Sequence, residues 1–205
     1  MEAKLNRHLQ RDRYGAFRLT DAIRPSFPVE IPPVEGYRIH HYQNKTHGLR
    51  LPVLTAAVSQ ERLFDLFLAL VKPLGPVVDV ILENSSDSGE EMREYDREAV
   101  DLPILTSYCC DFEELLVNDG CTGIAVLNED LQMEVHFDEH KLLYAYAPFL
   151  WRFERIMAEF GVTRCDDLQL ITEAEHIHCT SPQHRASFEG LCLKLGVEEP
   201  AGYGW

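Results

Sequence analysis

Residues 131–138, LQMEVHFD, alternate between apolar and polar side chains without exception. A period of two is typical of a β-strand with one buried and one wet face, and it argues against an amphipathic helix over the same residues. Residues 138–141, DEHK, form the connection to a further strand within KLLYAYA, and the segment CTGIAVLN precedes residue 131. Together these segments predict an antiparallel three-strand meander over residues 121–147.

The strand prediction decides the meaning of an apparent zinc motif. His136, Glu139 and His140 match H-x-x-E-H, which supplies two metal ligands and a general base in one family of zinc peptidases. That mechanism requires a helix, in which a spacing of four puts both imidazoles on one face. A strand followed by a turn does not provide such a face, so we interpret the match as a coincidence.

The rest of the chain predicts the fold class. LRLPVLTAAV and PVVDVILE are buried-strand patterns, and an apolar stripe between them predicts a helix over 60–72, which gives a β-α-β unit near 49–83 with parallel strands. A second stripe predicts a helix over 148–160, closed by Gly161. We therefore predict an α+β fold with a mixed β-sheet, composed of the β-α-β unit and the antiparallel three-strand meander, with helices packed on it.

The chain is predicted to form one domain. Residues 1–48 should form an N-terminal helix, near 2–13, and a Pro-rich extended segment, RPSFPVEIPPVEG, that packs on the domain. Residues 49–205 should form a single α+β domain with an acidic loop at 84–100 that leads into a polar helix.

Charge and composition restrict the function. The 34 acidic residues against 19 Lys and Arg give a formal net charge of −15, which argues against nucleic-acid binding. The longest apolar run, residues 63–71, is far shorter than the ~20 residues that span a bilayer, so no membrane partner is expected. The N-terminus lacks a signal-peptide pattern and the six cysteines show no C-x-x-C pair, which favours reduced thiols in a cytoplasmic protein.

Two groups of histidines and carboxylates are candidate metal ligands. His136, Asp138 and His140 follow the strand and its turn. His176 and His178 lie in a short helix predicted over 173–179 from a T-x-x-E capping box. These five residues are the candidate ligands for Zn²⁺, Mn²⁺ or Fe²⁺. Glu173 and Glu175 are candidates for a catalytic base or supporting residues. We expect the two groups to lie close together without forming a complete site.

Two functional hypotheses follow. The first is a non-catalytic cytoplasmic binding or regulatory protein, whose acidic surface meets a protein partner and which needs no cofactor. The alternative is a metal-dependent hydrolase that uses the His/carboxylate cluster, because a metal-bound water is a nucleophile that such ligands can generate. The sequence identifies neither the partner nor the substrate, and it leaves the oligomeric state open.

Overall fold

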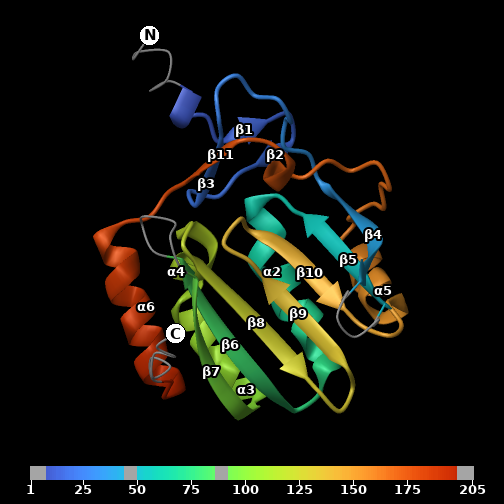
Figure 1. Ribbon diagram of the computed structural model, residues 1–205, viewed down its shortest axis with the longest axis vertical. Helices are drawn as coiled ribbons and strands as arrows, with labels where there is room; N and C mark the ends of the chain where they lie inside the picture. The colour runs from blue at the N-terminus through green and yellow to red at the C-terminus, as the bar shows by residue number, and fades with distance from the viewer. Residues whose placement is uncertain (1–7, 44–49, 86–91, 198–205) are drawn as a thin grey trace.

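One large sheet with helices on one of its faces forms the body of the protein (Figure 1). The computed structural model describes residues 8–43, 50–85 and 92–197. The structure contains both helices and strands, so the predicted α+β class is confirmed. None of the helices in these segments is both long and apolar enough to cross a membrane.

Within the described residues, seven strands form the main sheet and four short strands form two small ribbons. The main sheet contains β4 (Gly36–Gln43), β5 (Arg50–Ala57), β6 (Val77–Ser85), β7 (Met92–Asp101), β8 (Thr122–Asn128), β9 (Met133–Phe137) and β10 (Leu142–Tyr146). The ribbons are β1 (Arg13–Tyr14) with β2 (Phe17–Arg18), and β3 (Ile23–Pro25) with β11 (His176–His178). The helices are α2 (Gln60–Val71), α3 (Leu102–Asp111), α4 (Glu113–Asn118), α5 (Trp151–Glu159) and α6 (Pro182–Leu195), with the 3₁₀ turns η1 (Lys72–Leu74) and η2 (Ile171–Glu173).

The order of the strands corrects the predicted topology. The sheet runs β4-β5-β10-β9-β8-β6-β7 and every neighbouring pair is antiparallel, so the predicted mixed sheet is wrong. Helix α2 does connect β5 to β6, and these two strands run in the same direction. However, β10, β9 and β8 lie between them, so they are not the adjacent parallel pair of a β-α-β unit. Strands β8, β9 and β10 are consecutive antiparallel neighbours.

The two faces of the sheet differ in chemistry. The face under the helices is apolar, and Phe67 of α2 meets Phe137 of β9 with ring centroids 5.3 Å apart. Each such side chain contributes roughly 1.5–3 kcal/mol by leaving water. The opposite face carries half-buried polar side chains, among them Glu134, His136 and Tyr144. The strict alternation of β9 produces this division, because successive side chains point to opposite faces.

Three local predictions need correction. From Met92 the segment predicted as an acidic loop at 84–100 and a polar helix is strand β7, and residues 86–91 lie outside the described residues. Of the helix predicted over 2–13, only residues 8 and 9 are helical among those described, and β1 begins at Arg13. The helix predicted over 173–179 is not formed, because η2 ends at Glu173 and β11 follows.

A second, smaller core attaches the N-terminal segment to one end of the main sheet. Leu19 and Ile23 are buried there together with Ala57 of β5, Leu142 of β10 and Leu170. Figure 1 shows β3 and β11 crossing this end of the sheet, above the turn that joins β9 to β10. The packing therefore brings the C-terminal histidines to the end of the predicted hairpin.

Candidate metal centre

Strand β11 presents two histidines on one side. It pairs antiparallel with β3, with His178 opposite Ile23 and His176 opposite Pro25. Residues i and i+2 of a strand lie on the same face, whereas in a helix they would point in nearly opposite directions. The change from the predicted helix to a strand is therefore what aligns the two imidazoles.

The third histidine comes from the turn between β9 and β10. The Asp138 carboxylate accepts a hydrogen bond from the Leu142 amide at 2.8 Å, and the Lys141 amide donates to the Asp138 carbonyl at 3.1 Å. These bonds fix the turn and direct His140 toward β11. The His140 ring lies 4.9 Å from that of His176 and 4.8 Å from that of His178, measured between centroids.

The three imidazoles form a group that could hold a metal ion. One ring nitrogen of each lies within 4.8 Å of the others, and all three residues are partly buried. Nitrogen ligands at 2.0–2.1 Å from a tetrahedral zinc ion are roughly 3.3 Å apart. To share one such ion the three nitrogens would have to approach one another by up to about 1.5 Å.

Hydrogen bonds select the same tautomer for all three rings. Nδ1 of His140 lies 3.0 Å from an oxygen of Asp138, Nδ1 of His176 lies 2.8 Å from the Ala174 carbonyl, and Nδ1 of His178 lies 2.5 Å from the Gly120 carbonyl. The two carbonyl oxygens can only accept a hydrogen bond, and so can the carboxylate of Asp138 when it is ionised. Each Nδ1 therefore carries the hydrogen. In each neutral ring Nε2 then holds the lone pair, which is the arrangement seen in histidine metal ligands.

A carboxylate lies beside this group. An oxygen of Glu139 is 4.0 Å from Nε2 of His140, and the other oxygen of Glu139 is buried without a hydrogen-bond partner among the described residues. A buried carboxylate oxygen without a partner is costly, and a cation or a water molecule held near it would remove that cost. Glu139 therefore lies beside the imidazole of His140 with one carboxylate oxygen still unpaired among the described residues.

The surroundings shift the pKa values of two of the imidazoles, His140 and His176, in opposite directions. Burial alone would lower the pKa of His140, but the hydrogen bond and charge of Asp138, with the charge of Glu139, outweigh it and raise the pKa. Burial lowers the pKa of His176 more than its bond to the Ala174 carbonyl raises it, and His140 and His178 lower it further. The negative charge that favours a proton on His140 equally favours a metal cation at the same nitrogen.

The remaining predicted site residues lie outside the group of three. His136 interacts with Glu83, at 2.8 Å between Nε2 and a carboxylate oxygen, and Asp138 lies behind His140 as its hydrogen-bond acceptor. Glu173 forms an ion pair with Arg38 at 2.6 Å, and Glu175 is exposed. The structure thus brings together three of the five predicted ligands. It also places Glu139, rather than Glu173 or Glu175, next to them.

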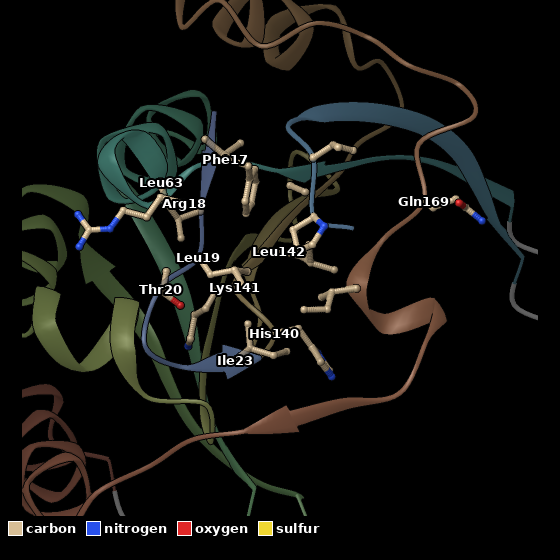
Figure 2. A pocket seen from close by; sticks show the side chains of 15 residues that line it. Phe17, Arg18, Leu19, Thr20, Ile23, Leu63, His140, Lys141, Leu142 and Gln169 are labelled. Atoms are coloured by element: carbon tan, nitrogen blue, oxygen red, sulfur yellow. The ribbon is translucent and has the colours of Figure 1, made fainter. Parts of the chain in front are cut away.

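A small cavity borders the group on the side of the N-terminal segment. It measures about 30 Å³, room for one or two water molecules, and Phe17, Leu19 and Ile23 contribute to its lining. Figure 2 shows His140 at its margin, with the ring extending toward β11, while Lys141 points away. The Lys141 ammonium donates to the Thr122 carbonyl at 2.7 Å. The cavity is too small to hold an organic ligand.

The pair of His136 and Glu83 predicts how the free energy of unfolding depends on pH. Burial lowers the pKa of His136, but the hydrogen bond and charge of Glu83 outweigh it, so the net shift is upward. The pair therefore stabilises the fold fully below the unfolded pKa of about 6.5, and this contribution is lost as the pH rises through the folded pKa. We expect the free energy of unfolding of the wild type to exceed that of His136→Gln by more at about pH 5.5 than at about pH 8.5.

Urea unfolding in the presence of EDTA measures this difference without interference from metal ions. Glu83→Gln is the matched variant: it removes the carboxylate of the pair, whereas His136→Gln removes the imidazole. It should abolish the same pH dependence. A difference between wild type and His136→Gln that stays constant or grows with pH would contradict the assignment.

The comparisons with known proteins leave the site to be judged on its geometry. The chain matches no protein family model, no curated protein and no solved structure.

Proposed function

We propose that His140, His176 and His178 bind one divalent transition-metal ion and that the protein is a metal-dependent hydrolase. One observation carries the proposal: the three rings each bring one nitrogen within 4.8 Å of the others, and every Nδ1 already has an oxygen acceptor, so that in the neutral rings the Nε2 lone pairs are available to a cation. Three histidines with an open fourth position are typical of catalytic zinc sites, whereas structural sites are closed by four protein ligands.

The ligand set favours zinc among the candidate metals. Neutral imidazoles suit zinc and iron better than manganese, which prefers carboxylate and other oxygen ligands. A metal ion with an open position supplies a polarised water molecule near neutral pH. Zn²⁺ therefore fits the described residues best, and Fe²⁺ is the next candidate.

Glu139 is the proposed general base. Its carboxylate lies beside Nε2 of His140 and lacks a partner for one oxygen. It would accept a proton from water as the water oxygen adds to an acyl or phosphoryl centre, and would return that proton to the leaving group. Asp138 would hold His140 in the ligand tautomer through the bond to Nδ1.

Metal content tests the binding step. Protein purified without a His-tag should contain close to one equivalent of zinc, as measured by mass spectrometry of the metal. After removal of that metal, Co²⁺ should produce the visible absorption bands of a tetrahedral site, saturating at one equivalent. Less than about a tenth of an equivalent of metal, together with no Co²⁺ bands, would refute the proposed site.

Hydrolysis of activated esters tests the catalytic step. The zinc-loaded protein should cleave 4-nitrophenyl acetate or bis(4-nitrophenyl) phosphate faster than the metal-free protein. Glu139→Gln should retain the metal but lower kcat by roughly 100-fold or more, the size expected for a general base. If zinc binds tightly and Glu139→Gln leaves the rate unchanged, the ion has a structural role and the hydrolase proposal fails.

The non-catalytic hypothesis stays a prediction. Its support is the net charge of −15 and the lack of a complete catalytic motif in the sequence. A protein that retains no metal but binds a partner from lysate at low salt, with release at high salt, would favour it over the hydrolase.

A further inference from the structure

A second cavity lies on the polar face of the main sheet, at the end remote from the three histidines. It measures about 450 Å³, which is the size of cavities that hold small organic ligands. Its walls come from five strands of the sheet, β4, β5, β8, β9 and β10, and from the turn between β8 and β9. Because His140 precedes β10 and Tyr146 ends it, the length of that strand separates this cavity from the candidate metal centre.

Aromatic rings form one side of the cavity. Tyr42 of β4 and Tyr146 of β10 both line it, with ring centroids 6.4 Å apart and ring planes at 85°. Tyr144 stacks beside Tyr146, at 6.4 Å and 20°, and supports it from the neighbouring position on the same face. Two ring faces set nearly at right angles can contact one cation from two directions.

The charge of the lining is negative. Two carboxylates, Glu129 and Glu134, line the cavity, and among the described residues no Lys, Arg or His lines it. Glu134 is half-buried, and among the described residues its carboxylate has no hydrogen bond or ion pair. Burial raises the pKa of Glu134, the charge of Glu83 raises it further, and His136 opposes them. An ionised Glu134 would therefore be stabilised by a bound cation.

The β8–β9 turn, which forms one side of the cavity, is ordered by hydrogen bonds within the protein. The Asn128 amide nitrogen donates to the Leu74 carbonyl at 2.9 Å, and its oxygen accepts from the Leu131 amide at 3.1 Å. The Gln132 amide also donates to the Glu129 carbonyl at 3.0 Å. Because these bonds already order the β8–β9 turn, binding of a ligand loses little free energy to the ordering of that turn.

We propose that this cavity binds a small organic cation, either a protonated amine or a quaternary ammonium, between Tyr42, Tyr146 and Glu134. Leu51 and Leu127 supply apolar contacts for the alkyl groups of the ligand. The site does not depend on the proposed metal centre, so it stands or fails separately from the hydrolase.

Titration calorimetry with choline and butylammonium tests the proposal on the full chain, in EDTA and again with zinc. Two cation–π contacts and one carboxylate should give a Kd of roughly 1 mM for at least one of the two probes. The neutral isostere of choline, 3,3-dimethylbutan-1-ol, should bind about tenfold more weakly or worse, because it lacks the charge.

Two variants and a control locate the binding. Glu134→Gln preserves shape and should weaken binding about tenfold, and Tyr42→Leu, on the half-exposed rim, should weaken it about fivefold. Glu94→Gln, an exposed carboxylate on β7, should leave the Kd unchanged. Equal affinity for choline and its neutral isostere would show an apolar groove only and overturn the proposal. It would also fail if neither cation saturates the protein at about ten times the expected Kd.

Discussion

Gly120→Ala should destabilise the protein by roughly 3 kcal/mol or more, as expected for an added atom where backbone already fills the space. A Cβ at this position would lie 2.3 Å from the Ala22 carbonyl oxygen and 2.8 Å from the Cys179 nitrogen. The close approach exists because the Gly120 amide donates to the Cys179 carbonyl and the Cys179 amide donates to the Ala22 carbonyl. The variant would have to separate these three segments.

Gly15→Ala is the matched control for this prediction. Gly15 has a φ of 62°, but a Cβ there would meet nothing within 4 Å, so only the backbone strain of about 1 kcal/mol is expected. Urea unfolding of the metal-free proteins gives both values. If Gly120→Ala costs no more than Gly15→Ala, then the junction of the two sheets is less tightly packed than the distances indicate. Because the Gly120 carbonyl also accepts from His178, the damaged junction should lower metal affinity as well.

Zinc should stabilise the wild-type protein, and His176→Asn or His178→Ala should abolish that effect. A ligand that binds only the folded state at 100 times its Kd adds about 2.7 kcal/mol to the free energy of unfolding. Loss of one of three ligands should weaken zinc binding by roughly 100-fold or more, so that the same zinc concentration adds less than about 0.5 kcal/mol.

Thermal and urea unfolding with and without zinc measure this difference. His41→Asn, an exposed histidine on β4, is the control and should keep the full stabilisation. Asp138→Asn should give an intermediate result, since loss of a partner behind a ligand costs roughly 10- to 100-fold in affinity. A zinc effect that survives in both His176→Asn and His178→Ala would place the ion elsewhere.

Local sequence patterns predicted the elements whose buried faces are determined by nearby residues. The helix expected over 60–72 is α2, and the one expected over 148–160 contains α5. The alternation over 131–138 corresponds to β9. In each case a periodic apolar stripe packs on the core, so period and burial agree.

The failures arise where a distant partner decides the structure. The capping box at Thr172 and Glu175 favours a helix, but pairing with β3, some 150 residues earlier, makes His176–His178 a strand. β7 is almost wholly exposed and charged, and such an edge strand carries little apolar pattern to detect.

The candidate site shows the same limit. The two histidine groups were expected to approach each other, and the structure brings His140, His176 and His178 together. Glu139 was noticed only as part of a motif that requires a helix. One oxygen of its carboxylate is buried without a partner among the described residues, and no local sequence pattern predicts that. His136 points along the sheet to Glu83, because its partner is two strands away rather than in the turn.

The strand order has a consequence for how the chain acquires its structure. The hairpins β4–β5 and β6–β7 are complete before residues 122–146 are synthesised, yet β8, β9 and β10 must enter between them. Until then β5 and β6, which include the apolar runs VLTAA and VVDVIL, each expose one unpaired edge. Such edges are templates for wrong pairing between chains. The centre of the sheet is thus its last part to form, and folding should be slow and prone to aggregation while the gap is open.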